Sequence, residues 1–569
     1  MKIGSSITFM LFSVLLAGGF HIWCSTVLSI VLGICILFIL KRQEQLIVYV
    51  NWSSVAVTAI LVSYICSVNW SVDRGMAAFG AVHFLPVFLF LLLATQMDGN
   101  QIDRMYMSIP WIGAAITILC WVMQFVPVIN NYVTINGRLT GTFQYANTYA
   151  LFLLVGCCVL LFQTKPDNRN QKCIGQQKET KFISGRFESD PFLFLFLVFG
   201  IMASGSRTTI LLLALIVTVF ICIRRDILAV ITVGGMILAA VLISFVIAKS
   251  GILESGRTLE EAASPGTLYC RLLYYKDALP VIVKHPFGLG YLGYFTLQTS
   301  FQTGVYSVRY VHNGLLQLLL DVGWIPAMLM CASIIMSFFH RGKSIMERMV
   351  LLVIAAHAMM DFDLQYMSIW FLLLLAMELR NGREIILRSR IGIILFCIVS
   401  IAVSGWMGFG DGLYQFGNRE ACLRVTPFYT YAWRDVVKES SSLETMEQAA
   451  DRILSLSDYV PDAHSVKGDA CLAKGEIRTM ISEKERAIQL APFCANGYLD
   501  YMDKLYALMQ HYLEVGDLSS AAACRQRILQ IPELMLSVKS GADPLAWKIE
   551  HKPELDLPSE YQDMIQSLR

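Results

Sequence analysis

Long apolar runs separated by short polar stretches make up the chain as far as about residue 408. An α-helix needs roughly 20 residues to cross the hydrocarbon layer of a membrane, and several runs reach that length. They predict an all-α, polytopic transmembrane helical bundle of about 12–13 spans over residues 1–408. The candidate spans are 5–21, 24–40, 47–66, 77–95, 106–127, 145–163, 191–204, 207–223, 227–248, 312–338, 346–361, 365–379 and 391–408.

The pattern changes from residue 409 onward. Residues 409–569 are charged and polar, with apolar positions at the helical period. Three similar stretches, RILSLSDYVP, RAIQLAP and RILQIP, end at Pro461, Pro492 and Pro532. Their separations lie near the roughly 34-residue period of tetratricopeptide helix pairs. We therefore expect residues 409–569 to form a tetratricopeptide-like (TPR-like) helical domain that binds a protein partner, with a plain helical bundle as the alternative.

Lysine and arginine residues in short connections predict the orientation of the spans. They cluster after spans two, six, eight, ten and twelve, and all five clusters fall on one side if the amino terminus is cytoplasmic. The opposite loops 67–76 and 128–142 hold one arginine each. This orientation predicts a multi-pass protein of the cell (cytoplasmic) membrane, with the loop 249–310 and the domain 409–569 extracytoplasmic.

Composition agrees with the membrane class and narrows the chemistry. Of 569 residues, 56% are hydrophobic and 15% are charged, against about 45–50% and 25% in soluble domains. A net charge of +2 without a basic stripe argues against a nucleic-acid partner. The 15 cysteines fall mostly in apolar runs, without CxxC or zinc-type spacing. The sequence therefore predicts neither a metal site nor a cofactor.

Ionisable residues beside the spans are the candidates for chemistry, because charge is costly there. His312 lies at the outer start of span 312–338, where an imidazole can accept a proton near neutral pH; Asp321 lies deeper on the same segment. Arg207 follows a Ser-Gly-Ser turn at the outer end of its span, and its guanidinium suits phosphate oxygens. The non-catalytic alternatives are that His312 is only a polar residue at the membrane interface and that Arg207 extends its charge to the interface.

Further polar residues fall on the same expected face. Arg271 lies in the outer loop, and Arg138 precedes Gln144 and Asn147 near the outer end of span 145–163. A solvated loop charge and a capped helix entrance are the alternatives for the two arginines. Together with His312 and Arg207, these residues predict a cationic pocket for a substrate with a phosphate or pyrophosphate head and a lipid tail.

Four motifs resemble the O-antigen ligase/polymerase family. They are GRLTGTFQYANTYA over 137–150, SGSRTT over 204–209, RxxYYxDAL…HPFGLG over 271–290 and HNGLLQLLLDVG over 312–323. The resemblance implies a metal-independent, inverting glycosyl transfer from an undecaprenyl-diphosphate-linked glycan to a sugar or other hydroxyl acceptor, in the assembly of cell-surface polysaccharide.

The resemblance also implies roles for individual residues. His312 would deprotonate the acceptor hydroxyl, while Arg207 and Arg271 would hold the diphosphate. Asp321 stands where the family often has a glutamate. The residues expected to bind substrate are Arg138, Gln144, Asn147, Asn313 and Asp321.

Other functions remain open at this point. A protein O-oligosaccharyltransferase of the same superfamily would use the TPR-like domain to recruit a protein acceptor. A polysaccharide or lipid transporter would need paired ionisable or broken-helix sites near mid-membrane, whereas His83, Asp321 and His357 are scattered. A non-enzymatic scaffold would keep the fold and work through the C-terminal domain.

Overall fold

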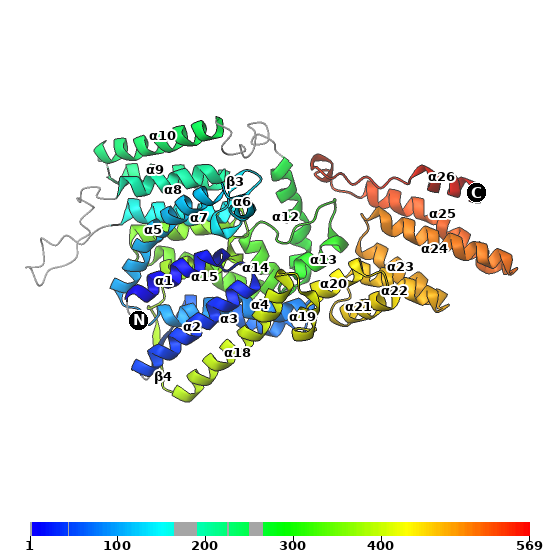
Figure 1. Cartoon of the computed structure of the whole chain (residues 1–569), viewed down its shortest axis with the longest axis horizontal. Helices are drawn as coiled ribbons and strands as arrows, with labels where there is room; N and C mark the ends of the chain where they lie inside the picture. Colours follow the sequence, from blue (N-terminus) through cyan, green and yellow to red (C-terminus); the bar gives the residue numbers. More distant parts are fainter. Residues whose placement is uncertain (1–2, 44, 164–189, 225–226, 250–265) are drawn as a thin grey trace, which may run out of the picture.

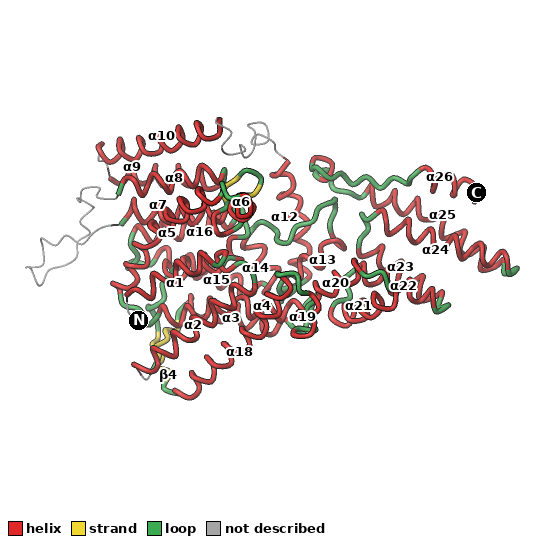
Figure 2. Tube along the Cα trace, viewed as in Figure 1, coloured by secondary structure: helices red, strands yellow, loops and turns green. Residues whose placement is uncertain are grey.

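The computed structural model describes residues 3–43, 45–163, 190–224, 227–249 and 266–569. The expected cluster of basic residues in 164–190 and the first part of the loop 249–310 therefore lie almost wholly outside the described residues. Helices dominate the described chain (Figure 2). Two short antiparallel pairs are the described strands: β1 (Leu46–Val50) with β4 (Arg383–Leu387), and β2 (Thr134–Ile135) with β3 (Arg138–Leu139). The all-α prediction is confirmed.

The apolar helices lie side by side and form the bundle in Figure 1. Six helices of the described chain are long and apolar enough to cross a membrane: α2 (Ile22–Gln43), α4 (Arg74–Ala94), α5 (Gly99–Met123), α9 (Arg207–Arg224), α10 (Ile227–Lys249) and α18 (Arg390–Gln415). Shorter apolar helices accompany them: α3 (Trp52–Ser67), α7 (Ala146–Phe162), α8 (Pro191–Ser204), α15 (Trp324–Phe339) and α17 (Met367–Ala376). The prediction of a multi-pass membrane protein is supported.

The centre of the bundle is the most apolar part of the chain. Every residue of α17 is buried, and nearly every residue of α7 is buried as well. A helix that is hydrophobic on all sides belongs inside other helices rather than at a surface. Few residues of α9 and α10 are fully buried, and α10 lies at the edge of the bundle (Figure 1), as lipid-facing helices do.

The expected spans 312–338 and 47–66 are among those that differ from the structure. The span predicted over 312–338 is two helices, α14 (Gly314–Val322) and α15, which meet at Gly323. Gly323 has a φ of +83°, and a Cβ there would lie 2.4 Å from the Pro286 carbonyl oxygen, so only glycine fits this break. The span predicted over 47–66 begins with β1 instead of a helical turn, because residues 46–50 pair with β4.

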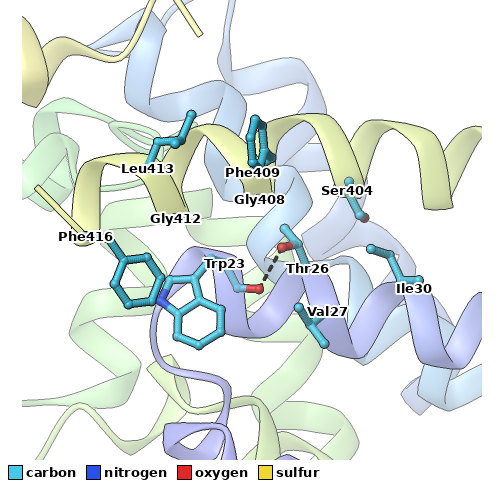
Figure 3. A pocket seen from close by; sticks show the side chains of 11 residues that line it. Trp23, Thr26, Val27, Ile30, Ser404, Gly408, Phe409, Gly412, Leu413 and Phe416 are labelled. Atoms are coloured by element: carbon cyan, nitrogen blue, oxygen red, sulfur yellow. Dashed lines mark hydrogen bonds between the residues drawn. The ribbon is translucent and has the colours of Figure 1, made fainter. Parts of the chain in front are cut away.

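Close packing of α2 against α18 depends on small residues of α18. A Cβ built on Gly408 would lie 1.9 Å from Thr26 Oγ1, whereas one built on Gly405 would meet nothing within 4 Å. Figure 3 shows Thr26 facing this part of α18, with its hydroxyl donating to the Trp23 carbonyl at 2.8 Å. Gly408 therefore sets how closely the two helices approach.

Gly408→Ala is expected to destabilise the bundle by about 1–3 kcal/mol, the usual cost of overfilling a packed core. Thermal unfolding in detergent measures the loss. Gly405→Ala is the matched control on the same helix and should be neutral or slightly stabilising, since alanine favours a helix over glycine. Equal unfolding temperatures for the two variants would contradict this account of the α2–α18 contact.

The C-terminal helices extend beyond one end of the bundle (Figure 1). They are α19 (Arg419–Val425), α20 (Thr430–Glu439), α21 (Leu443–Leu456), α22 (Pro461–Ala473), α23 (Ile477–Leu490), α24 (Ala495–Glu514), α25 (Leu518–Ser540) and α26 (Ser559–Leu568). From α20 to α25 each helix packs against the next. Pro461 begins α22 and Pro492 follows α23, but Pro532 lies inside α25. The TPR-like array stays a prediction.

Candidate functional site

A buried carboxylate, Asp361, lies where several of the predicted polar residues meet. It follows α16 (Ile345–Ala358) in the loop that leads to the short helix η4 (Asp363–Gln365), outside the membrane helices. Asp361 is 2% exposed. A buried charge of this kind is tolerated only when its oxygens are satisfied by donors.

Residues of α7 and its N-terminal approach supply the first donors to Asp361. The Tyr145 hydroxyl lies 2.8 and 2.9 Å from the two carboxylate oxygens, and the Asn147 amide donates to Oδ2 at 2.6 Å. The Phe362 backbone N–H donates to Oδ1 at 3.0 Å. These contacts fix the plane of the carboxylate before the charged partners are added.

His312 and Arg271 are the ionisable partners of Asp361. His312 Nδ1 lies 3.1 Å from Asp361 Oδ1, and Arg271 Nη2 lies 3.5 Å from Oδ2. Arg271 also donates through Nη1 to the Met360 carbonyl at 2.6 Å. The structure therefore joins two residues predicted for catalysis through a carboxylate that lies far from both in sequence.

The electrostatics of Asp361 follow from these partners. Burial by itself raises the pKa of the Asp361 carboxyl. The hydrogen bond from His312 and the charges of His312 and Arg271 outweigh burial, and the pKa of Asp361 lies well below its ordinary value. The group is therefore a carboxylate at neutral pH.

His312 is held in an unusual backbone conformation. Its φ is +53°, in the left-handed region that residues other than glycine rarely adopt. The Tyr275 hydroxyl donates to the His312 carbonyl at 2.7 Å, and the imidazole packs edge-on against the Phe362 ring with centroids 5.0 Å apart. Such backbone strain persists where the surroundings fix it, often at functional sites.

Arg138 connects the site to the turn between α8 and α9. Its Nε donates to the Ser204 carbonyl at 2.7 Å, and its Nη2 donates to the Asn147 side-chain oxygen at 2.7 Å. Arg207 begins α9 immediately after this turn and is exposed. Arg138 thus supports Asn147, which in turn binds Asp361.

The remaining predicted residues have other surroundings. Asn313 caps α14 through the N–H groups of Leu315 and Leu316 and donates to the Met359 carbonyl at 2.8 Å, so it fixes the loop that carries Asp361. The Gln144 side chain lies 3.3 Å from His21. The buried Asp321 accepts from Tyr64 at 3.1 Å and Gln317 at 2.9 Å.

A second buried polar network lies directly behind the loop. His357 Nδ1 lies 2.6 Å from Asp363 Oδ2, and Thr148 donates to Asp363 Oδ1 at 2.8 Å. His357 Nε2 lies 3.0 Å from the Thr209 hydroxyl of α9. All of these residues are buried, so the network anchors both ends of the loop that presents Asp361.

A pocket of about 520 Å³ opens beside His312 and Arg271. Its lining residues are Gly266, Thr267, Cys270, Arg271, Tyr274, His312, Lys548, Ile549 and Glu550. A second pocket of about 300 Å³ lies between α2 and α18 and is lined mainly by apolar side chains and glycines (Figure 3). The first pocket holds the ionisable groups and is the candidate site for chemistry.

Sequence reasoning missed Asp361 and Tyr145. Tyr145 stands inside a quoted motif, but nothing singled out its hydroxyl. Asp361 stands at the end of the expected span 346–361, and an acidic residue at the edge of an apolar run was the available signal. Among the described residues, no group of three or more His, Cys, Asp or Glu side chains could hold a metal ion.

Comparison with known proteins gives one positive finding. The sequence profile of the family described as "O-Antigen ligase" matches residues 192–331, a range that contains Arg207, Arg271 and His312. Searches of curated proteins and of solved structures each found no match. Over residues 192–331 the chain is therefore similar to the O-antigen ligase family, which together with the apolar helices supports a multi-pass membrane protein with glycan-transferring activity in polysaccharide assembly.

Proposed function

We propose that this chain is a metal-independent, inverting glycosyltransferase of the cell membrane. It would move or polymerise a glycan from an undecaprenyl-diphosphate-linked donor onto a sugar or other hydroxyl acceptor. The observation that carries the proposal is the pairing of Asp361 with His312, which lines a pocket together with Arg271. The family match over residues 192–331 supports the class of reaction.

His312 acts as the general base in this proposal. A neutral imidazole that donates its Nδ1–H to Asp361 leaves Nε2 as an acceptor. Nε2 takes the proton of the acceptor hydroxyl as its oxygen attacks the anomeric carbon of the donor sugar. The Asp361 carboxylate stabilises the imidazolium that forms, as acidic partners of catalytic histidines do.

Arg271 acts on the leaving group. As the bond between the anomeric carbon and the diphosphate oxygen breaks, negative charge grows on the diphosphate. A guanidinium carries five N–H donors, and the contacts with Met360 and Asp361 account for two of them. Others can bind phosphate oxygens. Arg207, at the N-terminus of α9, is the second arginine proposed to hold the diphosphate.

A single displacement of this kind inverts the configuration at the anomeric carbon. The positive-inside pattern of the sequence places the pocket on the outer face in this proposal. There the substrates are a lipid-linked glycan embedded in the membrane and a glycan or protein acceptor that approaches from outside.

The proposal is tested with purified protein in proteoliposomes that contain undecaprenyl-diphosphate oligosaccharide, with EDTA present. The wild type should release undecaprenyl diphosphate and lengthen or transfer the glycan. Arg271→Ala should slow release about 10²-fold, the usual cost of removing one group that binds growing charge. Mass spectrometry of the lipid products measures both.

Arg74→Ala is the matched control, because Arg74 is an exposed arginine at the start of α4 on the same expected face. It should keep the wild-type rate. A wild type that releases no diphosphate lipid from any of several donors would contradict the transferase proposal. Equal rates for Arg271→Ala and Arg74→Ala would contradict the role of Arg271.

A further inference from the structure

One wall of the pocket beside His312 comes from the far end of the chain. Lys548, Ile549 and Glu550 line the pocket together with residues of α12 (Gly266–Lys284). They belong to residues 541–550, which follow α25 and lead back from the C-terminal helices to the membrane bundle. We name residues 541–550 the return segment.

The return segment is fixed to the membrane part of the chain. The Asp543 backbone N–H donates to the Thr303 carbonyl at 2.9 Å, and the Asp543 carboxylate forms an ion pair with Lys276 of α12. Ala546 is fully buried and Ile549 is 5% exposed. Both belong to an apolar cluster that also contains Leu273 and Tyr274 of α12. Polar and apolar contacts thus hold the segment in place.

The anchored residues leave two charged side chains at the pocket. Lys548 and Glu550 are exposed on either side of the buried Ile549. The Lys548 ammonium lies 5.3 Å from the centroid of the Tyr269 ring, a distance that favours a cation–π contact and limits its freedom. An ammonium donates hydrogen bonds and a carboxylate accepts them, and a surface that offers both suits a ligand rich in hydroxyl groups.

The position of the wall separates it from the lipid. The C-terminal helices lie beyond the end of the bundle (Figure 1), and the return segment follows α25, so its wall is the part of the pocket that belongs to the C-terminal domain. A diphosphate is tied to its membrane-embedded lipid, whereas the sugar chain extends away from it. The return segment is therefore more suited to sugar than to diphosphate.

We propose that the return segment binds the sugar chain of a substrate, with Lys548 and Glu550 contacting its hydroxyl groups. The inference rests on the proposed function for the glycan nature of the substrate. The sugar can belong to the lipid-linked donor or to the acceptor, and both offer the same hydroxyl chemistry. The C-terminal domain is then part of the substrate site, and not only a surface for a partner.

Equilibrium binding to the full chain in lipid nanodiscs tests the inference without requiring transfer. The probes are lipid-linked oligosaccharides extracted from the producing cells and the same oligosaccharides freed from lipid by mild acid. Lys548→Ala/Glu550→Ala should weaken binding about tenfold for at least one probe, since each variant loses hydrogen bonds to a charged group. Lys552→Ala/Glu554→Ala is the matched control, because both residues are exposed and neither lines the pocket.

Each outcome has a defined meaning. Weaker binding of the lipid-linked probe alone assigns the segment to the donor glycan, and weaker binding of the freed oligosaccharide assigns it to the acceptor glycan. Wild-type binding of both probes by Lys548→Ala/Glu550→Ala overturns the inference, as does a wild type that binds neither probe. A wild type that binds glycan but releases no diphosphate lipid refutes the transferase proposal alone.

Discussion

Replacing His312 with alanine is expected to slow glycan transfer about 10³–10⁴-fold, the upper part of the range for losing a general base. The acceptor hydroxyl is a poor nucleophile unless a base accepts its proton. His312 is the pocket residue whose ring is oriented by a carboxylate. Release of undecaprenyl diphosphate under single-turnover conditions measures the loss, because product dissociation does not then limit the rate.

Two further variants separate chemistry from folding. His312→Gly removes the imidazole but relieves the left-handed backbone at φ +53°, so it should fold at least as well as His312→Ala and be equally inactive. His285→Ala removes a histidine that follows α12 and does not line the pocket, and should keep wild-type transfer. Transfer by His312→Gly at the wild-type rate would show that another group is the base.

Asp361→Asn is expected to slow transfer about 10³-fold with little change in the affinity for the donor. An amide has nearly the same shape, but it carries no negative charge to stabilise an imidazolium. The new amide N–H₂ group also faces N–H and O–H groups that donated hydrogen bonds to the carboxylate. Because two donors cannot bond to each other, the hydrogen bond that orients His312 is weakened. Rates at saturating donor, compared with the donor KM, distinguish this effect from weakened binding.

Tyr145→Phe is a milder change at the same carboxylate and should slow transfer less than Asp361→Asn. It removes the hydroxyl that lies within 2.9 Å of both Asp361 oxygens but leaves the charge. Losing the hydrogen bond from the neutral Tyr145 hydroxyl to the carboxylate should slow transfer about tenfold. This is a much smaller loss of rate than the one expected for Asp361→Asn. An Asp361→Asn enzyme as fast as Tyr145→Phe would mean that the charge of Asp361 has no part in the reaction.

The sequence predicted the apolar helices well, because a run of apolar residues long enough to span a membrane is a local property. The helices α8, α9 and α10 begin and end within a few residues of the expected spans. The break at Gly323 was not predictable in the same way. It depends on the Pro286 carbonyl, which approaches Gly323 from the preceding loop, and such a contact leaves no periodic signal.

The sequence predicted two residues of the candidate site, but not the carboxylate that joins them. His312 was singled out as an ionisable group beside a span and Arg271 as a charge in the outer loop, and the structure joins them through Asp361. Asp361 itself was counted as the end of a span, because one acidic residue hardly changes the hydropathy of an apolar run. Its partners come from the approach to α7, from α12 and from the start of α14, and only the fold brings these segments together.

Gln144 and Asp321 have partners within the protein that the sequence did not indicate. Both were expected to bind substrate, and their contacts are with His21 and with Tyr64 and Gln317. Motif order does not reveal such contacts, and the role of both residues in substrate binding stays a prediction. The wall formed by Lys548 and Glu550 is a further long-range feature, since nothing in residues 541–550 indicates that they return to α12.

The most direct test of the central claim is a double-mutant cycle between His312 and Asp361, read as single-turnover release of undecaprenyl diphosphate. The account predicts that His312→Ala/Asp361→Asn is no slower than His312→Ala alone, because Asp361 acts through the imidazole. If the rate of the double variant is instead reduced by the product of the two single-variant factors, the residues act independently. The proposed His312–Asp361 centre would then be wrong.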